Sequence, residues 1–357
     1  MKVFVKTFGC VCNHRDSENI CGILLENDFE VVDSVDESDI VVVNSCGVKT
    51  VTQNRVVSFI NSLPEDKKVF VGGCLPRMVD LKKICPGVDA VFDPNTILSL
   101  PDILRESKDV SSDEKEGRLN IPIKRMKKSV ANIPICQGCL GECTYCSVRF
   151  ARGELKSYPK DEILREVRDA VSEGCTRINL TAQDTGCWGL DIGDSLPNLL
   201  REVLAVKGDF IVRVGMMNPD FAKKYLKDLV EIFKSEKVLR FVHVPVQSGS
   251  DKVLGDMGRK YSVDDFKGVV AAFRKGIPKI CISTDVIVGF PSETEVDFRE
   301  TVELIKETRP DIVNISRFGA RLGTPAAELE QLSDREVKGR SVLLDRVVKR
   351  SFQSPRN

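Results

Sequence analysis

Hydrophobic and polar positions alternate between two patterns over the first hundred residues. β-Branched and aromatic runs at residues 3–5, 40–44 and 69–73 are bounded by polar residues, which is typical of strands buried in a parallel sheet. Residues 20–25 carry apolar side chains at helical spacing, and Asp16 and Ser17 are the predicted N-cap candidates of that helix. Alternating units of this length predict an α/β fold in which an N-terminal domain forms a small open parallel sheet.

The alternation resumes after a charged, proline-containing stretch and predicts a second domain. Five apolar runs separated by helix-like segments predict a full or partial (β/α) barrel. The predicted strands are 177–181, 210–214, 241–246, 280–288 and 312–316, and the clearest predicted helices are 161–173, 264–275 and a basic C-terminal one at 333–350. The expected organisation is an N-terminal sheet domain at 1–110, a linker at 111–129, the barrel at 130–330 and a short C-terminal helix within 331–357.

Composition narrows the function. The 53 basic residues balance the 53 acidic ones, which excludes a globally basic nucleic-acid coat but leaves room for a local basic groove. We find no apolar run long enough for a signal peptide or a membrane span, so we expect a cytoplasmic protein without a membrane partner. The chain has 13 cysteines and only two histidines. Because cytosolic thiols stay reduced unless they bind metal or do redox chemistry, this excess favours cysteine-ligated zinc or iron–sulfur clusters.

Two sets of three cysteines occupy positions at which they could form a metal site. Cys10, Cys46 and Cys74 each follow a predicted strand, where ligands of open α/β sheets gather. Residues 139–146 form C-x3-C-x2-C, whose three thiolates could hold a cubane cluster and leave its fourth iron open. Cys136 adds a second C-x2-C pair, which would suit zinc, but only three residues separate the pairs where a zinc ribbon has about 15–20.

The second set carries a recognisable resemblance. C-x3-C-x-(aromatic)-C, with Tyr145 as the aromatic residue, resembles the signature of radical S-adenosylmethionine (SAM) enzymes, and GCLGECTYCSVRFARG resembles their methylthiotransferase branch. The resemblance extends over nearly the whole chain. Its other segments are TFGCVCNHRDSE, VVVNSCGVKT, VGGCLPR, TAQDTGCWG, RVGMMNP, HVPVQSGS, the segment around residues 257–261, TDVIVGFPSETEVDF and GTPA.

Within that family, GCLGECTYC, TAQDTG and RVGMMNP are most similar to the archaeal and eukaryotic branch. The resemblance implies a tRNA (N6-L-threonylcarbamoyladenosine(37)-C2)-methylthiotransferase, an enzyme that adds a methylthio group to C2 of this adenosine at tRNA position 37. Three alternatives remain at this point: action on isopentenyladenosine-37, action on a ribosomal protein, and a cluster-binding paralogue without full activity. A plain zinc-binding structural protein is a further alternative.

The resemblance also implies site residues and cofactors. Two 4Fe-4S clusters and SAM are expected, and an electron-donor protein must reduce the SAM-binding cluster. The first cluster is expected on Cys10, Cys46 and Cys74, and the SAM-coordinating one on Cys139, Cys143 and Cys146. Tyr145, Gln183 and Gln247 are candidate SAM contacts. No individual catalytic side chain is assigned.

The nucleic-acid partner is expected to be the tRNA anticodon stem-loop. The basic stretch Lys124, Arg125, Lys127 and Lys128 is a candidate phosphate contact, although a solvated linker is an equally good interpretation. Family members continue into a β-rich RNA-binding TRAM domain, whereas the printed sequence ends at Asn357. We therefore expect the TRAM domain to be missing here, and a separate RNA-binding partner is one way to replace it.

Overall fold

The computed structural model describes residues 1–115 and 117–353, so the last four residues of the expected C-terminal segment lie outside the described residues. The chain forms two compact units. The first contains Met1–Cys139, Ser147–Gln183 and Val206–Phe210, and the second contains Leu140–Cys146, Asp184–Ala205 and the chain from Ile211 onward. The domain boundaries expected from the sequence remain a prediction.

The first unit contains a five-stranded sheet with the order β2-β1-β3-β4-β5. Its strands are β1 (Lys2–Thr7), β2 (Glu30–Val32), β3 (Ile40–Ser45), β4 (Lys68–Gly73) and β5 (Ala90–Val91). All four pairings are parallel. The open parallel α/β sheet expected from the sequence is therefore confirmed. Parallel strands place their carboxyl ends at one edge, so the loops that follow β1, β3 and β4 emerge together.

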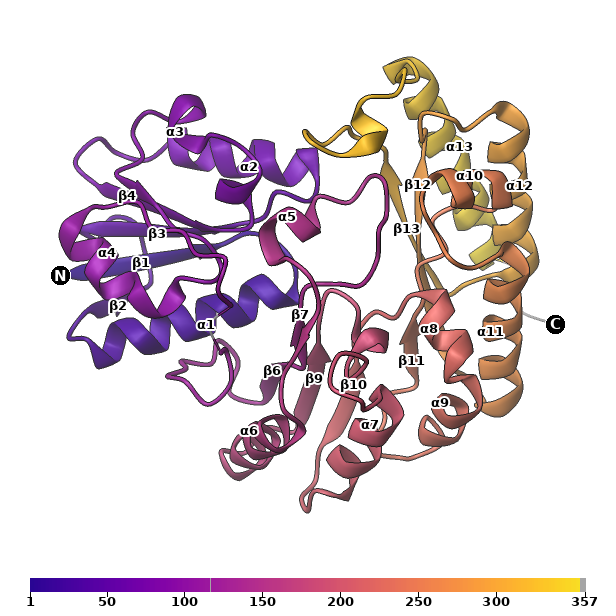
Figure 1. The fold of residues 1–357 in the computed structure, drawn as a ribbon, viewed down its shortest axis with the longest axis horizontal. Helices are drawn as coiled ribbons and strands as arrows, with labels where there is room; N and C mark the ends of the chain where they lie inside the picture. Colours follow the sequence, from indigo (N-terminus) through magenta and orange to yellow (C-terminus); the bar gives the residue numbers. More distant parts are fainter. Residues whose placement is uncertain (116, 354–357) are drawn as a thin grey trace. The chain divides into compact units, whose positions relative to one another are not determined.

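Helices cover both faces of this sheet (Figure 1). Helices α1 (Val11–Glu26) and α4 (Leu100–Glu106) lie on one face, and α2 (Thr50–Asn61) and α3 (Leu81–Ile84) lie on the other. Every residue of β3 is buried, and its side chains alternate between two cores. Val42 packs with the residues of α1 and α4, whereas Val41 and Val43 pack with those of α2 and α3. This two-sided burial explains the continuous β-branched run of β3.

Helix α1 begins earlier than the sequence predicted. Cys10 occupies the N-cap position, and the helix starts at Val11. The prediction that Asp16 or Ser17 is the N-cap is wrong, because both residues lie inside the helix and are buried. The first half of α1 is polar yet buried, since its side chains bond to other polar groups of the first unit. An apolar periodicity cannot reveal such a segment.

The rest of the first unit contains the first strands and helix of the βα pattern predicted for the barrel. Strand β6 (Val130–Pro134) pairs in parallel with β9 (Arg177–Thr181), and α6 (Lys160–Ser172) packs on β6. The short strands β7 (Cys136–Gln137) and β8 (Lys156–Ser157) are antiparallel, and α5 (Val148–Arg152) lies between them in sequence. Short 3-10 helices span Leu75–Arg77 and Ile97–Ser99.

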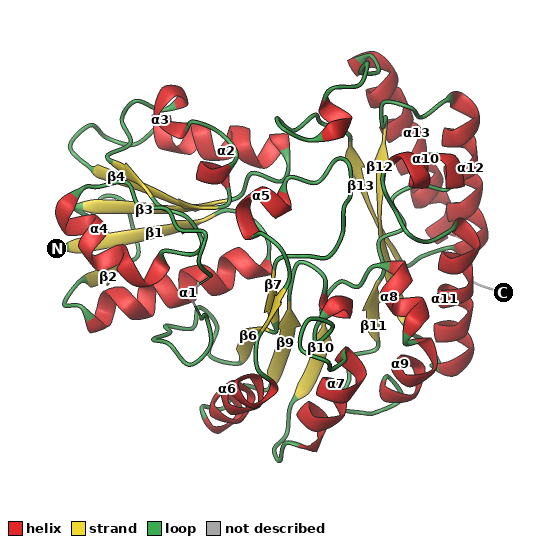
Figure 2. Ribbon diagram, viewed as in Figure 1, coloured by secondary structure: helices red, strands yellow, loops and turns green. Residues whose placement is uncertain are grey.

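The second unit continues the βα pattern (Figure 2). Its parallel sheet has the order β11-β12-β13, with strands at Phe241–His243, Cys281–Val288 and Ile312–Arg317. A further strand, β10, spans Ile211–Val214. The helices are α7 (Leu196–Ala205), α8 (Pro219–Lys224), α9 (Leu226–Ile232), α10 (Asp251–Asp256), α11 (Val263–Gly276), α12 (Glu295–Thr308) and α13 (Asp334–Gln353), with 3-10 turns at Thr185–Cys187 and Pro325–Ala327.

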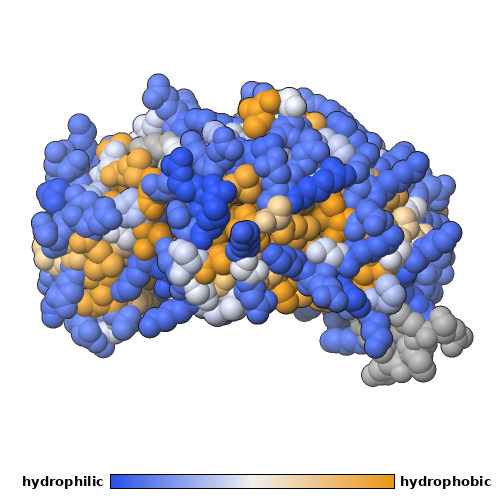
Figure 3. Space-filling view, turned by 90° about the horizontal axis from the view of Figure 1, so that it is seen from below, coloured by the Kyte–Doolittle hydropathy of each residue, from blue (hydrophilic) through white to orange (hydrophobic). Residues whose placement is uncertain are grey.

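Local sequence explains where two of these helices begin. Ser262 and Asp265 form a capping box at the start of α11, and Thr294 and Asp297 form one at the start of α12. Over the described part of the chain, no helix combines the length and apolar character needed to cross a membrane. Figure 3 shows a face on which hydrophilic residues predominate and apolar residues are visible between them.

Candidate active site

Three cysteines occupy the edge of the first sheet where its strands end. Cys10 follows β1, Cys46 follows β3 and Cys74 follows β4. These three strands are neighbours, so the thiols come from adjacent loops. The backbone N–H of Cys74 also bonds to the carbonyl of Ser45, 2.9 Å away, which ties the second loop to the third. Cys46 and Cys74 are buried and Cys10 is exposed, so the group reaches the surface on one side only.

Two glycines allow these loops to approach each other. Gly9 has a φ of +129°, and a Cβ there would lie 2.7 Å from the Cβ of Cys46. Gly73 has a φ of +88°, and a Cβ there would lie 2.3 Å from the carbonyl oxygen of Ser45. A larger residue at either position would be strained and would also push the loops apart. Each glycine immediately precedes a cysteine of the set.

The three thiols are in different electrostatic surroundings. A hydrogen bond from Cys12 is the main cause that lowers the pKa of Cys10 to about 6. Burial raises the pKa of Cys46 to about 12. Burial also raises the pKa of Cys74, and the charge of Arg152 opposes that rise. Buried thiols of this kind lose their protons when a metal supplies the compensating charge.

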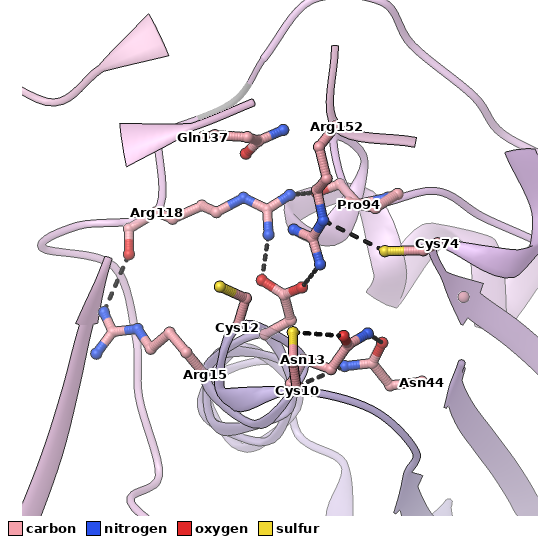
Figure 4. Close-up of polar contacts among 12 residues, drawn as sticks. Cys10, Cys12, Asn13, Arg15, Asn44, Cys74, Pro94, Arg118, Gln137 and Arg152 are labelled. Atoms are coloured by element: carbon pink, nitrogen blue, oxygen red, sulfur yellow. Dashed lines mark hydrogen bonds and ion pairs between the residues drawn. The ribbon is translucent and has the colours of Figure 1, made fainter. Parts of the chain in front are cut away.

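A buried charge network stands beside Cys74 (Figure 4). Arg152 Nη2 donates a hydrogen bond to the Asp16 carboxylate at 2.6 Å, and Arg118 forms a second ion pair with the same carboxylate. The Arg152 Nε donates to the Cys74 Sγ across 3.4 Å. Burial raises the pKa of Asp16, but the two guanidinium groups outweigh burial and hold that pKa below its usual value. The network therefore carries two positive charges and one negative charge, and its net positive charge faces a cysteine sulfur.

A second group of hydrogen-bonded polar side chains holds Cys10. The Cys10 Sγ donates to Asn13 Oδ1 at 3.4 Å, and Asn13 Nδ2 donates to Asn44 Oδ1 at 3.3 Å. The Asn44 amide in turn donates to the backbone carbonyl of Asn13 at 2.8 Å and to Ser17 Oγ at 2.9 Å. Helix α1 and strand β3 are thus joined by polar side chains at the level of the thiols.

Cys12 and Gln183 line a small cavity of the first unit together with Asp16, Arg118 and Arg152. Both the oxygen and the nitrogen of the Gln183 side-chain amide contact residues of the first unit. Its Oε1 accepts from the Gly138 N–H at 2.8 Å, and its Nε2 lies 3.6 Å from the Cys12 Sγ. Gln183 therefore fixes the residue that precedes Cys139. Its assignment as a SAM contact stays a prediction.

The C-x3-C-x2-C loop passes from the first unit, which includes Cys139, to the second, which includes Cys143 and Cys146. All three cysteines are half-buried and none forms a disulfide. Within the second unit, Thr144 anchors the loop through its backbone. Its N–H donates to the carbonyl of Met257 and its carbonyl accepts from the N–H of Ala326, each at 3.0 Å. Gly258 must be a glycine here, because a Cβ would lie 2.9 Å from the carbonyl of Glu142 at a φ of +71°.

Tyr145 belongs to a row of hydrogen-bonded polar side chains in the second unit, which runs from half-buried Tyr145 and Arg259 to buried Asn218 and Asp184. Arg259 donates to the Tyr145 hydroxyl and to Asn218 Oδ1, and Asn218 Nδ2 donates to Asp184 Oδ2. The Tyr145 ring packs edge-on against Phe290, with the ring centroids 6.4 Å apart. Burial raises the pKa of Tyr145 well above its usual value. Tyr145 therefore holds the cysteine loop in place, while its contact with SAM stays a prediction.

Asp184 is the last side chain in this row of hydrogen bonds and is fully buried. Burial, followed by the nearby Asp220, raises the pKa of Asp184 to about 7, against the hydrogen bonds from Asn218 and Gly186. The sequence alone assigned no role in the site to Asp184, Arg259, Asp16 or Arg152. All four lie inside the quoted motif segments, so their membership of those segments was the available signal. Nothing in the apolar periodicity indicated that Asp184, Asp16 and Arg152 are buried.

The remaining predicted site residues lie in distinct settings. Lys124, Lys127 and Lys128 are exposed, whereas Arg125 pairs with Glu173 at 2.8 Å and its side chain is only 9% exposed. Gln247 is buried and has a φ of +69°, and its backbone bonds to Asp285 and Ile287 in the β12 region. RNA contact by Lys124, Arg125, Lys127 and Lys128 and SAM contact by Gln247 stay predictions.

The donor sets suit iron–sulfur clusters. In the part of the chain that the structure describes, no three or more His, Cys, Asp or Glu side chains form a group that could hold a metal ion. A 4Fe-4S cluster is held differently, because each thiolate ligates a different iron atom and the thiolates therefore stay apart. Three cysteines on strand ends, with glycines that permit close approach and a guanidinium beside one sulfur, fit such a cluster. Three cysteines on one anchored loop fit the other.

Comparisons with known proteins agree with this picture. Residues 133–305 match the family model of the radical SAM superfamily, and residues 2–93 match that of the uncharacterized protein family UPF0004. The radical SAM methyltransferase TsrM from Kitasatospora setae has a similar fold, with a TM-score of 0.65 and 15% identity over 91% of this chain and 75% of that chain. The fold and the cysteine motif define a radical SAM enzyme with an additional sheet domain.

Curated relatives give a narrower assignment. The probable threonylcarbamoyladenosine tRNA methylthiotransferase of Pyrococcus horikoshii is 41% identical over 97% of this chain and 84% of the relative. The protein of the same name from Methanocaldococcus jannaschii is 40% identical over 97% of this chain and 82% of the relative. The chain belongs to the threonylcarbamoyladenosine tRNA methylthiotransferase family. The family resemblance found in the sequence is thereby confirmed.

Proposed function

We propose that this enzyme replaces the C2 hydrogen of N6-threonylcarbamoyladenosine at position 37 of tRNA with a methylthio group. The observation that carries the proposal is the match to relatives of that name at about 40% identity over 97% of the chain. Isopentenyladenosine and a ribosomal protein are weaker candidates, because the relatives that match so much of this chain carry the threonylcarbamoyladenosine name.

The two cysteine sets would hold the cofactors. Cys10, Cys46 and Cys74 would ligate one 4Fe-4S cluster, and Cys139, Cys143 and Cys146 would ligate the SAM-coordinating one. When bound, the clusters and SAM supply the radical, the sulfur and the methyl group. The chain's own residues position these groups. Arg152 and Arg118 place positive charge beside Cys74, and Thr144 with Tyr145 keeps the second cysteine loop in one conformation.

The tRNA partner would bind through its anticodon stem-loop. Because the reacting carbon lies on a base, we expect the adenosine to be turned out of its stack, as in other enzymes that act on bases. An electron-donor protein would reduce the SAM-binding cluster, and a separate RNA-binding protein could add affinity for tRNA. We place this reaction in the cytoplasm, where tRNA and reduced thiols are both present.

The deciding experiment is mass spectrometry of tRNA nucleosides from a strain that lacks this protein and has no second copy. Loss of the methylthio form, together with its return when the gene is restored, is expected. An unchanged amount of the methylthio form contradicts the proposal. Iron analysis of the anaerobically reconstituted protein adds an independent readout, since two cubane clusters require about eight iron atoms per chain.

A further inference from the structure

A surface groove of the first unit lies between the end of β1 and one face of α2. Its α2 residues include Asn54, Arg55, Ser58 and Phe59, whose spacing of three and four places them on one side of the helix. Lys6 and Phe8 from the end of β1 complete the lining. We call these six residues the Phe8 groove. Its volume of about 520 Å³ is large enough for part of a nucleotide chain.

Two aromatic rings form the floor of the Phe8 groove. The ring centroids of Phe8 and Phe59 are 5.7 Å apart, and the rings are inclined by 57°. Both side chains are half-buried, because they pack on the outer side of the core between α2 and the sheet. Each ring therefore combines a fixed position with a surface that solvent can reach. A rigid, accessible aromatic surface is what a stacked base requires.

Positive charge borders these rings. Lys6 Nζ lies 6.0 Å from the Phe8 centroid and 5.7 Å from the Phe59 centroid. Neither Lys6 nor Arg55 forms an ion pair with another described residue, and no aspartate or glutamate lines the groove. Acidic residues outnumber basic ones over residues 1–120, so this absence of acidic lining runs against the local composition. The groove thus complements a polyanion.

The groove also adjoins the loops that carry two cysteines of the first set. Phe8 lies two residues before Cys10, and α2 begins at Thr50, four residues after Cys46. An exposed helix surface without a ligand would account for Arg55, but it would not account for the aromatic pair of Phe8 and Phe59 beside it. Two uncompensated cations, two aromatic rings and polar Asn54 and Ser58 side chains together match the composition of sites for single-stranded nucleic acid.

We propose that the Phe8 groove binds a single-stranded segment of the tRNA anticodon arm. Lys6 and Arg55 bind phosphates, one base stacks on Phe8 and Phe59, and Asn54 and Ser58 bond to polar atoms of the same nucleotide. This inference rests on the proposed function, since that function makes tRNA the substrate. It assigns RNA contact to the sheet domain, in addition to the lysines predicted between the domains.

The test measures binding of an anticodon stem-loop RNA to the full chain with its clusters bound, by fluorescence anisotropy at several salt concentrations. The variant Lys6→Glu/Arg55→Glu is compared with Lys68→Glu/Lys108→Glu. The second variant makes the same change of charge at two exposed lysines of the same unit that form no ion pair with a described residue. We expect at least a tenfold weaker affinity for the first variant and less than a twofold change for the second. The slope of log affinity against log salt should fall by about 1.4 for two lost phosphate contacts.

A second variant separates stacking from charge. Phe59→Leu keeps an apolar side chain on the core, so circular dichroism should remain that of the parent. Loss of one stacked base should weaken binding by roughly fivefold to a hundredfold without changing the salt slope. A fully double-stranded RNA of equal length should bind the parent and this variant equally well.

Equal losses for the two charge-reversal pairs would mean general electrostatic attraction and would overturn the groove assignment. Preference for an acidic peptide over RNA would also overturn it. The proposed function is tested independently of RNA binding, by mass spectrometry of tRNA nucleosides. Unchanged nucleosides in the deletion strain with groove-dependent RNA binding would refute the function alone, whereas lost methylthiolation with unaltered binding by the groove variants would refute the groove alone.

Discussion

The guanidinium Nε of Arg152 lies 3.4 Å from the Sγ of Cys74, and both side chains are buried. Arg152 ends α5, only six residues after Cys146, whereas Cys74 follows β4 of the sheet. A residue from the segment that follows the C-x3-C-x2-C motif therefore donates to a sulfur of the other cysteine set. Hydrogen bonds to ligating sulfurs tune iron–sulfur clusters, so Arg152 would tune a cluster held by the proposed ligand Cys74.

The first prediction concerns the charge of Arg152. Arg152→Gln should destabilise the chain by about 3 kcal/mol, because it removes one partner of a buried ion pair and leaves Asp16 with Arg118 alone. It should also shift the reduction potential of the cluster at Cys74 to more negative values, since a positive donor is lost. Denaturant unfolding and a spectroscopic redox titration measure the two effects. Arg299→Gln, at an exposed pair with Glu295, should change neither.

The second prediction concerns the glycine before Cys74. Gly73 and Gly174 have nearly equal φ values of +88° and +89°, but a Cβ would collide with the Ser45 carbonyl only at Gly73. Gly174→Ala should therefore cost about 1–2 kcal/mol from backbone strain alone. Gly73→Ala should cost clearly more and should reduce iron binding, because the third cysteine loop must shift. Similar unfolding free energies and iron contents for the two variants would contradict this account.

The third prediction separates ligand cysteines from packing cysteines. Cys46→Ala should lower the iron content from about eight to about four atoms per chain, as one cluster is lost. Cys85 is also buried, but it packs in the core between α2, α3 and the sheet. Cys85→Ala should leave the iron content unchanged and should cost only about 1 kcal/mol of stability. If Cys46→Ala retains eight iron atoms, the first set is not a cluster site.

The fourth prediction concerns Asp184 and pH. Its folded-state pKa of about 7 lies above the usual value of 3.8, so the folded chain binds a proton that the unfolded chain has released. Stability should therefore fall as pH rises from about 4 to about 7, by at most about 4 kcal/mol from this group. Asp184→Asn should remove this slope. Urea unfolding of the apoprotein at pH 5 and pH 8 tests it, and an equal pH dependence in parent and variant would contradict the assignment.

The sequence by itself determined the fold class, the family and the positions of the cysteines. Buried parallel strands need continuous β-branched runs, so β3 and β4 could be located to within one residue. The short spacing of the C-x3-C-x2-C motif also needs no tertiary information, because its three thiolates lie on one loop. Cys10, Cys46 and Cys74 could be assigned to one sheet edge since each follows a parallel strand.

Only the tertiary structure decided what surrounds these cysteines. Asp16 looked like an N-cap, yet it is a buried carboxylate held by Arg118 and Arg152 from segments about a hundred residues away along the chain. Arg125, a candidate phosphate contact, forms an ion pair with Glu173, which lies 48 residues further along the chain. A hydropathy pattern reports whether a side chain prefers water, not whether a distant residue will neutralise its charge. That compensation depends on contacts between remote segments, and these exist only once the chain has folded.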